Sequence, residues 1–172
     1  ANNYEHSYMH RDVVTHICVS KVTEFIITGS ADGHVKFWKK MAKDLEFVKH
    51  YQAHLGPIHD MVISPDEKQL MTMSSDSMIK FFEIIGFDMS NMIEISFIPK
   101  TGIWLFNSHR LSDRVAVSDM NSNKIYIFKS TDASSTPLHE LSSIHSFPVL
   151  SMQLHPVYQS IVISIDQKGI IE

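Results

Sequence analysis

Histidine and aspartate side chains recur along this sequence at a nearly constant interval. Four aspartates lie 44, 43 and 47 residues apart: Asp32, Asp76, Asp119 and Asp166. Three histidines precede the first, second and fourth of them by 22, 22 and 21 residues: His10, His54 and His145. A histidine beside a carboxylate, with a hydroxyl nearby, resembles a catalytic triad, but it can equally form a buried structural network. Because a nucleophile would not be duplicated at every interval, we predict a structural network and assign no catalytic residue.

The first unit supplies the most complete set of groups for such a network. His10 offers two ring nitrogens, Thr28 a hydroxyl, Asp32 an ionised acceptor and Trp38 an indole donor, with Ser30 as an alternative hydroxyl. We expect Asp32 to accept a hydrogen bond from His10 and the other two groups to extend the network. A fully satisfied network of this kind fixes one conformation.

The other units keep parts of this pattern. Phe82 follows Asp76 by six residues, as Trp38 follows Asp32, so the second unit has no indole donor. Phe128 follows Asp119 by nine residues, and the extra turn residues 121–123 account for the longer gap. No histidine stands in register for Asp119.

Each aspartate lies between a short β-like run and a second apolar run, as in the turn of Asp32 and Gly33. A period of 40–45 residues with a histidine, an aspartate and an aromatic in register is typical of WD40 propeller blades. The sequence therefore predicts an all-β fold of about four WD40 β-propeller blades in an incomplete, open propeller. The expected blades are residues 10–52, 54–98, 99–140 and 145–172, the last truncated inside its third strand.

Three local expectations follow from the same pattern. The third blade is the most degenerate, with strands expected at 102–106, 114–118 and 124–129. Residues 88–92 fall outside the repeat and are interpreted as a connecting segment with adaptable methionines. Residues 130–136 are polar and predict a surface loop.

Composition excludes several classes of protein. The 172 residues carry a net charge of −4, which gives no strong attraction to nucleic acid or to an anionic membrane. No apolar run is long enough to cross a bilayer, and the N-terminus has no signal-peptide core. One cysteine, Cys18, fits a buried small hydrophobe better than a nucleophile. The eleven histidines lack a metal-binding motif, so no metal and no cofactor are expected. The basic zone on the first blade is interpreted as a solvated edge: Lys36, Lys39, Lys40, Lys43 and Lys49.

Several stretches go beyond a general WD pattern: residues 9–12, 30–40, 47–50, 87–92 and 156–158. They resemble the N-terminal WD-repeat part of the WD-repeat cyclophilins, a peptidylprolyl isomerase family, and the resemblance covers essentially the whole chain. It implies a nuclear, spliceosome-associated protein. It also implies a longer parent chain with the remaining blades and a C-terminal cyclophilin domain, which carries the isomerase activity and is absent here.

We therefore expect a protein-binding scaffold with spliceosomal partners, acting in pre-mRNA splicing, and no enzyme activity in this chain. Two alternatives stay open: a peptidylprolyl cis-trans isomerase, and a propeller that reads chromatin or peptides on its central face. One cluster alone could be recruited for an active site, and it lies in the most degenerate blade: Phe106, His109, Arg110 and Arg114.

Overall fold

The computed structural model describes residues 8–107 and 110–172, and for residues 107–112 it describes no side chains. The described residues form fourteen β-strands and no helix, which confirms the predicted all-β class. The first sheet contains β1 (Val14–Val19), β2 (Phe25–Ser30), β3 (His34–Lys40) and β4 (Leu45–Gln52), antiparallel and adjacent in chain order.

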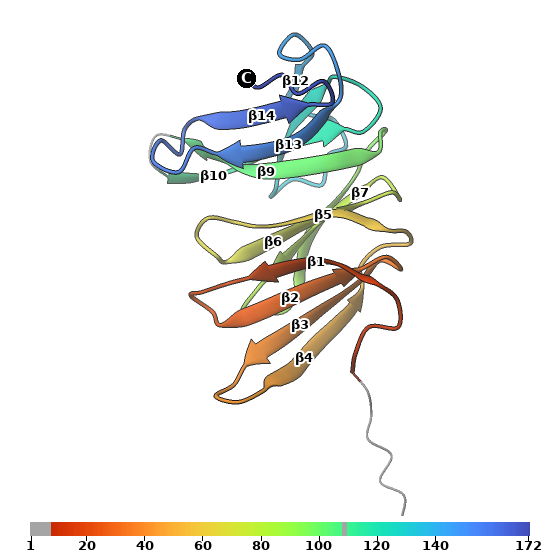
Figure 1. Cartoon of the computed structure of the whole chain (residues 1–172), viewed down its shortest axis with the longest axis vertical. Coiled ribbons are helices and arrows are strands. Elements are labelled where there is room, and N and C mark those ends of the chain that lie inside the picture. The colour runs from red at the N-terminus through yellow and green to blue at the C-terminus, as the bar shows by residue number, and fades with distance from the viewer. Residues whose placement is uncertain (1–7, 108–109) are drawn as a thin grey trace, which may run out of the picture.

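Two further four-stranded sheets repeat this order. The second contains β5 (Ile58–Ile63), β6 (Gln69–Ser74), β7 (Met78–Glu83) and β8 (Met89–Glu94), and the third contains β9 (Pro99–Asn107), β10 (Arg110–Asp119), β11 (Ile125–Lys129) and β12 (His139–Leu141). The fourth sheet pairs β13 (Val149–Leu154) with β14 (Val162–Asp166), and Ile171 forms an isolated bridge to Ile165. Figure 1 shows the sheets following one another along the long axis as separate blades, in an open arrangement.

Two local expectations were wrong. Residues 88–92 are not a connecting segment, because most of them lie in β8, the outer strand of the second sheet. Lys36 is not on a solvated edge but is buried, and its ammonium donates hydrogen bonds to the backbone carbonyls of Tyr8 and Met9. Strand pairing decides the first outcome and packing the second, and the hydropathy of a single strand reports neither. The third sheet, whose sequence pattern is the most degenerate, nevertheless has the longest strands, of nine and ten residues.

Tight turns after Asp32 and Asp76 bring the second and third strands of the first and second sheets together. Gly33, next to Asp32, has a φ of 83°, and its amide donates to the carbonyl of Ser30. Ser77 occupies the same place next to Asp76 with a φ of 60°. This left-handed conformation suits glycine, which has no Cβ to clash with the backbone.

The hydrophobic core lies between the sheets. Leu70 and Phe82 of the second sheet belong to a cluster with Phe37 of the first sheet. Met71 and Phe81, one position away along the same two strands, belong to a cluster with the third sheet. Successive strand residues point to opposite faces, so the second sheet buries a face on each side. A third cluster joins the third and fourth sheets.

Gly33 also lies close to the backbone that leads into the second sheet. This close approach allows a prediction. A Cβ at Gly33 would lie 2.3 Å from the carbonyl oxygen of His54 and 2.8 Å from that of Gly56, whereas a Cβ at Gly169 (φ 80°) would meet nothing within 4 Å. We expect Gly169→Ala to cost only the strain of a left-handed residue, about 1–2 kcal/mol. Gly33→Ala should cost clearly more, because two backbone carbonyls must also move. Urea unfolding of both variants measures the difference, and equal losses would contradict the close approach.

Candidate functional site

The second sheet holds a histidine–aspartate network. His54 is buried, and its Nδ1 lies 3.1 Å from an Asp76 carboxylate oxygen while its Nε2 lies 2.8 Å from the Thr72 hydroxyl. Because the carboxylate can only accept, Nδ1 carries the proton and Nε2 accepts from Thr72. Burial lowers the pKa of His54, and Asp76 opposes that shift only in part. The network therefore contains a neutral imidazole. Phe82, at the position that Trp38 holds in the first sheet, is buried, and its side chain has no hydrogen-bond donor.

The fourth sheet holds a similar network with a different hydroxyl. His145 Nδ1 lies 3.3 Å from Asp166, and Nε2 lies 2.7 Å from Ser164, two residues before the aspartate. Burial pushes the pKa of Asp166 up, but backbone amides of Ile170 and Lys168, together with His145, hold it below its ordinary value. In the second sheet the hydroxyl belongs to Thr72, four residues before Asp76. The hydroxyl groups of the two networks therefore come from different positions along the strand.

The first sheet does not form the expected bond between His10 and Asp32. Trp38 Nε1 donates to Thr28 Oγ1 at 2.9 Å, and the Thr28 hydroxyl lies 2.7 Å from His10 Nε2. Asp32 instead accepts from the Ser30 hydroxyl and the His34 amide, and His10 Nδ1 is buried with no hydrogen-bond partner. Both of these bonds go to Asp32 Oδ1, so the carboxylate bonds within its own turn and not to the preceding loop.

The third sheet replaces the polar network with an aromatic stack. Asp119 accepts from the amide of Asn121 and the hydroxyl of Ser122, within its own turn. Phe97, 22 residues before Asp119, occupies the position of the missing histidine and stacks on Tyr126 with ring centroids 4.4 Å apart. Phe128 is buried in the same cluster. The histidine pattern does not point to Phe97, although the interval of 22 residues before Asp119 does.

Side chains of neighbouring sheets also bond to each other, which the repeat did not predict. His16 of β1 lies 3.1 Å from the carbonyl of His59 in β5, and His59 lies 2.8 Å from the carbonyl of Pro99 in β9. Trp104 of β9 donates to the carbonyl of Val62 at 3.1 Å. The interval of 43 residues between His16 and His59 matches the spacing of the aspartates, so it could have indicated from the sequence that these two residues lie close together. These bonds hold the first strands of successive sheets in a fixed order.

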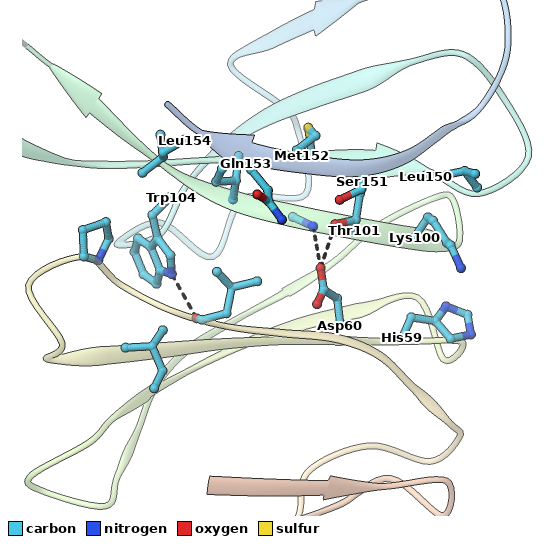
Figure 2. A pocket seen from close by; sticks show the side chains of 15 residues that line it. His59, Asp60, Lys100, Thr101, Trp104, Leu150, Ser151, Met152, Gln153 and Leu154 are labelled. Carbon is cyan, nitrogen blue, oxygen red and sulfur yellow. Dashed lines mark hydrogen bonds between the residues drawn. The ribbon is translucent and has the colours of Figure 1, made fainter. Parts of the chain in front are cut away.

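A groove of about 560 Å3 lies between β5, β9 and β13. One of its walls is fixed, because Asp60 accepts from the Thr101 hydroxyl at 2.8 Å and from the Gly102 amide at 3.1 Å. Figure 2 shows Ser151 and Gln153 of β13 beside Thr101, with Asp60 on the opposite side. Polar side chains from three sheets therefore meet in one open site.

Several polar groups of the groove are available to a partner. Among the described residues, the side chains of Lys100, Ser151 and Gln153 have no hydrogen-bond partner, and Leu150 adds an apolar side chain that is 43% exposed. These groups can bind another polypeptide through hydrogen bonds and apolar contact. They lack the arrangement of a nucleophile, a base and an orienting acid that covalent catalysis requires.

The remaining candidates form no reactive site among the described side chains. His109 lies outside the described residues, as does the side chain of Arg110, while Phe106 pairs with Leu111 on the β9–β10 hairpin. No group of three histidine, cysteine or acidic side chains in the described part of the chain is placed to hold a metal ion. Burial, with help from Asp60, raises the pKa of Cys18 to about 12, so this thiol stays protonated. No described segment forms a helix long and apolar enough to cross a membrane.

Comparison with known proteins agrees with this architecture. The family model WD40, "WD domain, G-beta repeat", matches residues 3–39 and 45–83. The human protein "Peptidylprolyl isomerase domain and WD repeat-containing protein 1" is 40% identical over all 172 residues, and "Peptidyl-prolyl cis-trans isomerase cyp15" of Rhizopus delemar is 44% identical over the same length. The chain spans 26% and 27% of these two relatives.

A solved structure supports the fold independently. The crystal structure of the C-terminal WD40 domain of Sif2 superposes with a TM-score of 0.72 at 17% identity, covering 92% of this chain and 42% of that one. At this identity the similarity concerns the fold alone. Together with the family match, it confirms the expected WD40 blades in an open propeller.

The two aspartates of the first and second sheets should differ in their contribution to stability. Asp76 is 11% exposed and bonds to His54, whereas Asp32 is 31% exposed and bonds within its turn. We expect Asp76→Ala to lower the free energy of unfolding by about 1–3 kcal/mol, because it leaves buried donors unpaired. Asp32→Ala should cost about 1 kcal/mol or less. Urea melts compare the two, and a larger loss at Asp32 would contradict the observed turn geometry.

Buried neutral histidine should make the fold sensitive to mild acid. The folded-state pKa of His54 lies below its ordinary value of 6.5, so the unfolded chain binds its proton more readily. Stability from His54 is therefore complete above about pH 6.5 and is lost as the pH falls toward the folded pKa. We expect urea midpoints to fall between about pH 7.5 and 5.5, and to fall less in His54→Gln. A matched change at the exposed His139, His139→Gln, should leave the wild-type slope; an unchanged slope in His54→Gln would contradict this assignment.

Proposed function

We propose that the chain is the WD-repeat part of a peptidylprolyl isomerase and WD-repeat protein and that it acts as a protein-interaction scaffold. One observation carries this proposal. Among the described residues, the groove between β5, β9 and β13 presents unpaired polar groups of β9 and β13 beside a wall fixed by the bonds from β9 to Asp60, while the histidine–aspartate pairs of the second and fourth sheets are committed to structural networks. The accessible chemistry is therefore that of binding.

The groove has the physical properties that recognition of a polypeptide requires. Lys100 and Gln153 can donate to backbone carbonyls, and Ser151 can both donate and accept. The bond from Thr101 to Asp60 keeps the wall from moving when a partner enters. Preorganised surfaces bind more tightly because less side-chain freedom is lost on association.

The groove does not favour the reading of methylated lysine. Aromatic cages bind quaternary ammonium groups through several ring faces. Trp104 is the one tryptophan, tyrosine or phenylalanine among the described residues that line the groove, and it is buried with its indole nitrogen bonded to Val62. The acidic group, Asp60, already accepts two hydrogen bonds from β9. Peptide recognition through donors and acceptors is therefore the better supported use.

We extend the proposal to the identity of the partners and to the place where the protein acts. The stretches at 30–40 and 87–92 resemble the WD-repeat cyclophilins, and this resemblance supports spliceosomal proteins as partners and the nucleus as the site of action. The two relatives are named as isomerases, and the chain spans about a quarter of each. We therefore assign isomerase activity in the whole protein to a cyclophilin domain outside these 172 residues, with the WD repeats positioning it on its substrates.

Capture from nuclear extract tests this function. The immobilised chain should retain a stoichiometric set of splicing proteins, identified by mass spectrometry. The double variant Lys100→Glu with Gln153→Glu should lose most of this set, because it replaces two hydrogen-bond donors of the groove with carboxylates that can only accept. A matched control, Lys43→Glu with Gln159→Glu, changes the same residue types at exposed positions outside the groove and should retain the set.

Two outcomes would contradict the proposal. If the groove variant and its control retain the same proteins, the groove is not the interaction site. If the purified chain accelerates exchange of a proline peptide, which uncatalysed takes roughly tens to hundreds of seconds, the chain is itself an isomerase and its assignment as a scaffold fails.

A further inference from the structure

A second cavity, of about 750 Å3, lies on the first sheet, away from the groove. The segment before β1 covers it, and the start of β3 and the end of β4 form its floor. Its polar lining consists mainly of basic groups, with one carboxylate: Arg11, Lys36, His10, His34, His50 and Asp32. We call this cavity the basic pocket.

Two imidazoles form one side of the basic pocket. His34 and His50 stack with ring centroids 4.7 Å apart and an angle of 18° between planes, and His34 Nδ1 is hydrogen-bonded to His50 Nε2. A bond between two imidazole nitrogens needs one proton, so at least one ring donates. The outer nitrogen of His34 lies 3.9 Å from Asp32, the one acidic side chain among the described residues that line the pocket.

A buried ammonium is fixed at the back of the basic pocket. Lys36 donates to the backbone carbonyls of Tyr8 and Met9, the latter at 2.9 Å, so two of its three protons are used. Its position is further defined by Phe47, whose ring centroid lies 5.8 Å from the ammonium. Lys36 thus holds a positive charge where solvent access is low, with one donor remaining.

The charges of the basic pocket are not balanced from within. Burial lowers the pKa of Lys36, and Arg11 lowers it further, while Asp32 opposes both. Burial lowers the pKa of His50, and the neighbouring His34 and Lys36 add to that shift. His10 has a buried Nδ1 without a hydrogen-bond partner. Each of these features would be relieved by an anion with several acceptor oxygens.

We propose that the basic pocket binds the phosphate group of a phosphorylated serine or threonine on a partner protein. The inference deepens the proposed scaffold function and rests on it, because it names the chemistry of one partner. A phosphomonoester carries about −1.5 to −2 charges at pH 7 and three acceptor oxygens. The two permanent cations, Arg11 and Lys36, outweigh Asp32, and the imidazoles supply further donors at fixed positions.

The same observations disfavour a nucleic acid. Single-stranded nucleic acids bind along charged tracks with exposed aromatic faces for the bases. Among the described residues, Tyr8 and Phe47 are the tyrosine and phenylalanine of the basic pocket; Tyr8 is 49% exposed, but the two rings stack on each other at 4.6 Å with an angle of 10° between planes and so form one short stack, not an extended aromatic track. The chain as a whole carries a net charge of −4. A single phosphate group on a neutral peptide fits this local site better than a phosphate backbone does.

Titration of the histidine side chains tests the proposal directly. The 172-residue chain, labelled with nitrogen-15 in histidine, is titrated at constant ionic strength with inorganic phosphate, with a Gly-Gly-phosphoserine-Gly-Gly peptide, with its unphosphorylated form, and with single-stranded poly(U). We expect the imidazole signals of His10, His34 and His50 to shift with phosphate and more strongly with the phosphopeptide. The unphosphorylated peptide and poly(U) should leave them unchanged.

A matched pair of variants makes the result specific. Arg11→Gln with His50→Gln removes two exposed members of the basic pocket and should weaken phosphopeptide binding by at least about tenfold, since charge-assisted hydrogen bonds are lost. Lys21→Gln with His139→Gln, both exposed and outside the pocket, should bind as the wild type does.

Three results would overturn the proposal: no shift with phosphate, tighter binding of poly(U) than of the phosphopeptide, or equal phosphopeptide affinity in both double variants. None of them would affect capture of proteins by the groove, which the changes at Lys100 and Gln153 test separately. Conversely, loss of all protein capture with phosphopeptide binding intact would remove the proposed scaffold function and leave the basic pocket as an anion site.

Discussion

Each sheet of this protein buries apolar side chains against a neighbouring sheet, and this packing is the constraint on which the other features depend. The second sheet shows it most clearly, because Phe82 packs toward the first sheet and Phe81 toward the third. A sheet of this kind cannot be stable as an isolated unit, since one of its apolar faces would meet water. The ends of the described arrangement carry such faces, with Ile17 66% exposed in β1 and Ile163 38% exposed in β14.

Polar networks then fix the positions of loops that apolar packing between the sheets does not determine. A buried histidine in the second and fourth sheets ties the loop before the sheet to the turn between its middle strands, through His54 with Asp76 and His145 with Asp166. In the third sheet, Phe97 makes the corresponding connection by stacking. Hydrogen bonds and aromatic contact thus serve the same purpose, because either one holds a loop against its own sheet. In the first sheet this connection is incomplete, because His10 Nδ1 is buried without a hydrogen-bond partner.

The surfaces available for function are those that these two kinds of interaction do not use. In the groove, Asp60 is consumed by bonds to β9, whereas Lys100 and Gln153 remain free among the described residues. In the basic pocket, packing of the segment before β1 buries Lys36 and leaves its charge without an acidic partner. Binding sites arise here where sheets or loops meet, since single strands offer only alternating side chains. This explains why a repeated architecture can carry different sites on different blades.

The sequence by itself determined the blades, because a period of about 44 residues with an aspartate turn reports the spacing of sheets directly. It also indicated which histidines face which aspartates in the second and fourth sheets, since equal intervals bring equal positions together. Only the tertiary structure decided that Asp32 turns to Ser30 instead of His10, that residues 89–94 form an outer strand, and that Lys36 is buried. The reason is physical: these outcomes depend on competition between nearby donors and on contacts between segments far apart in the chain, and no local pattern encodes either.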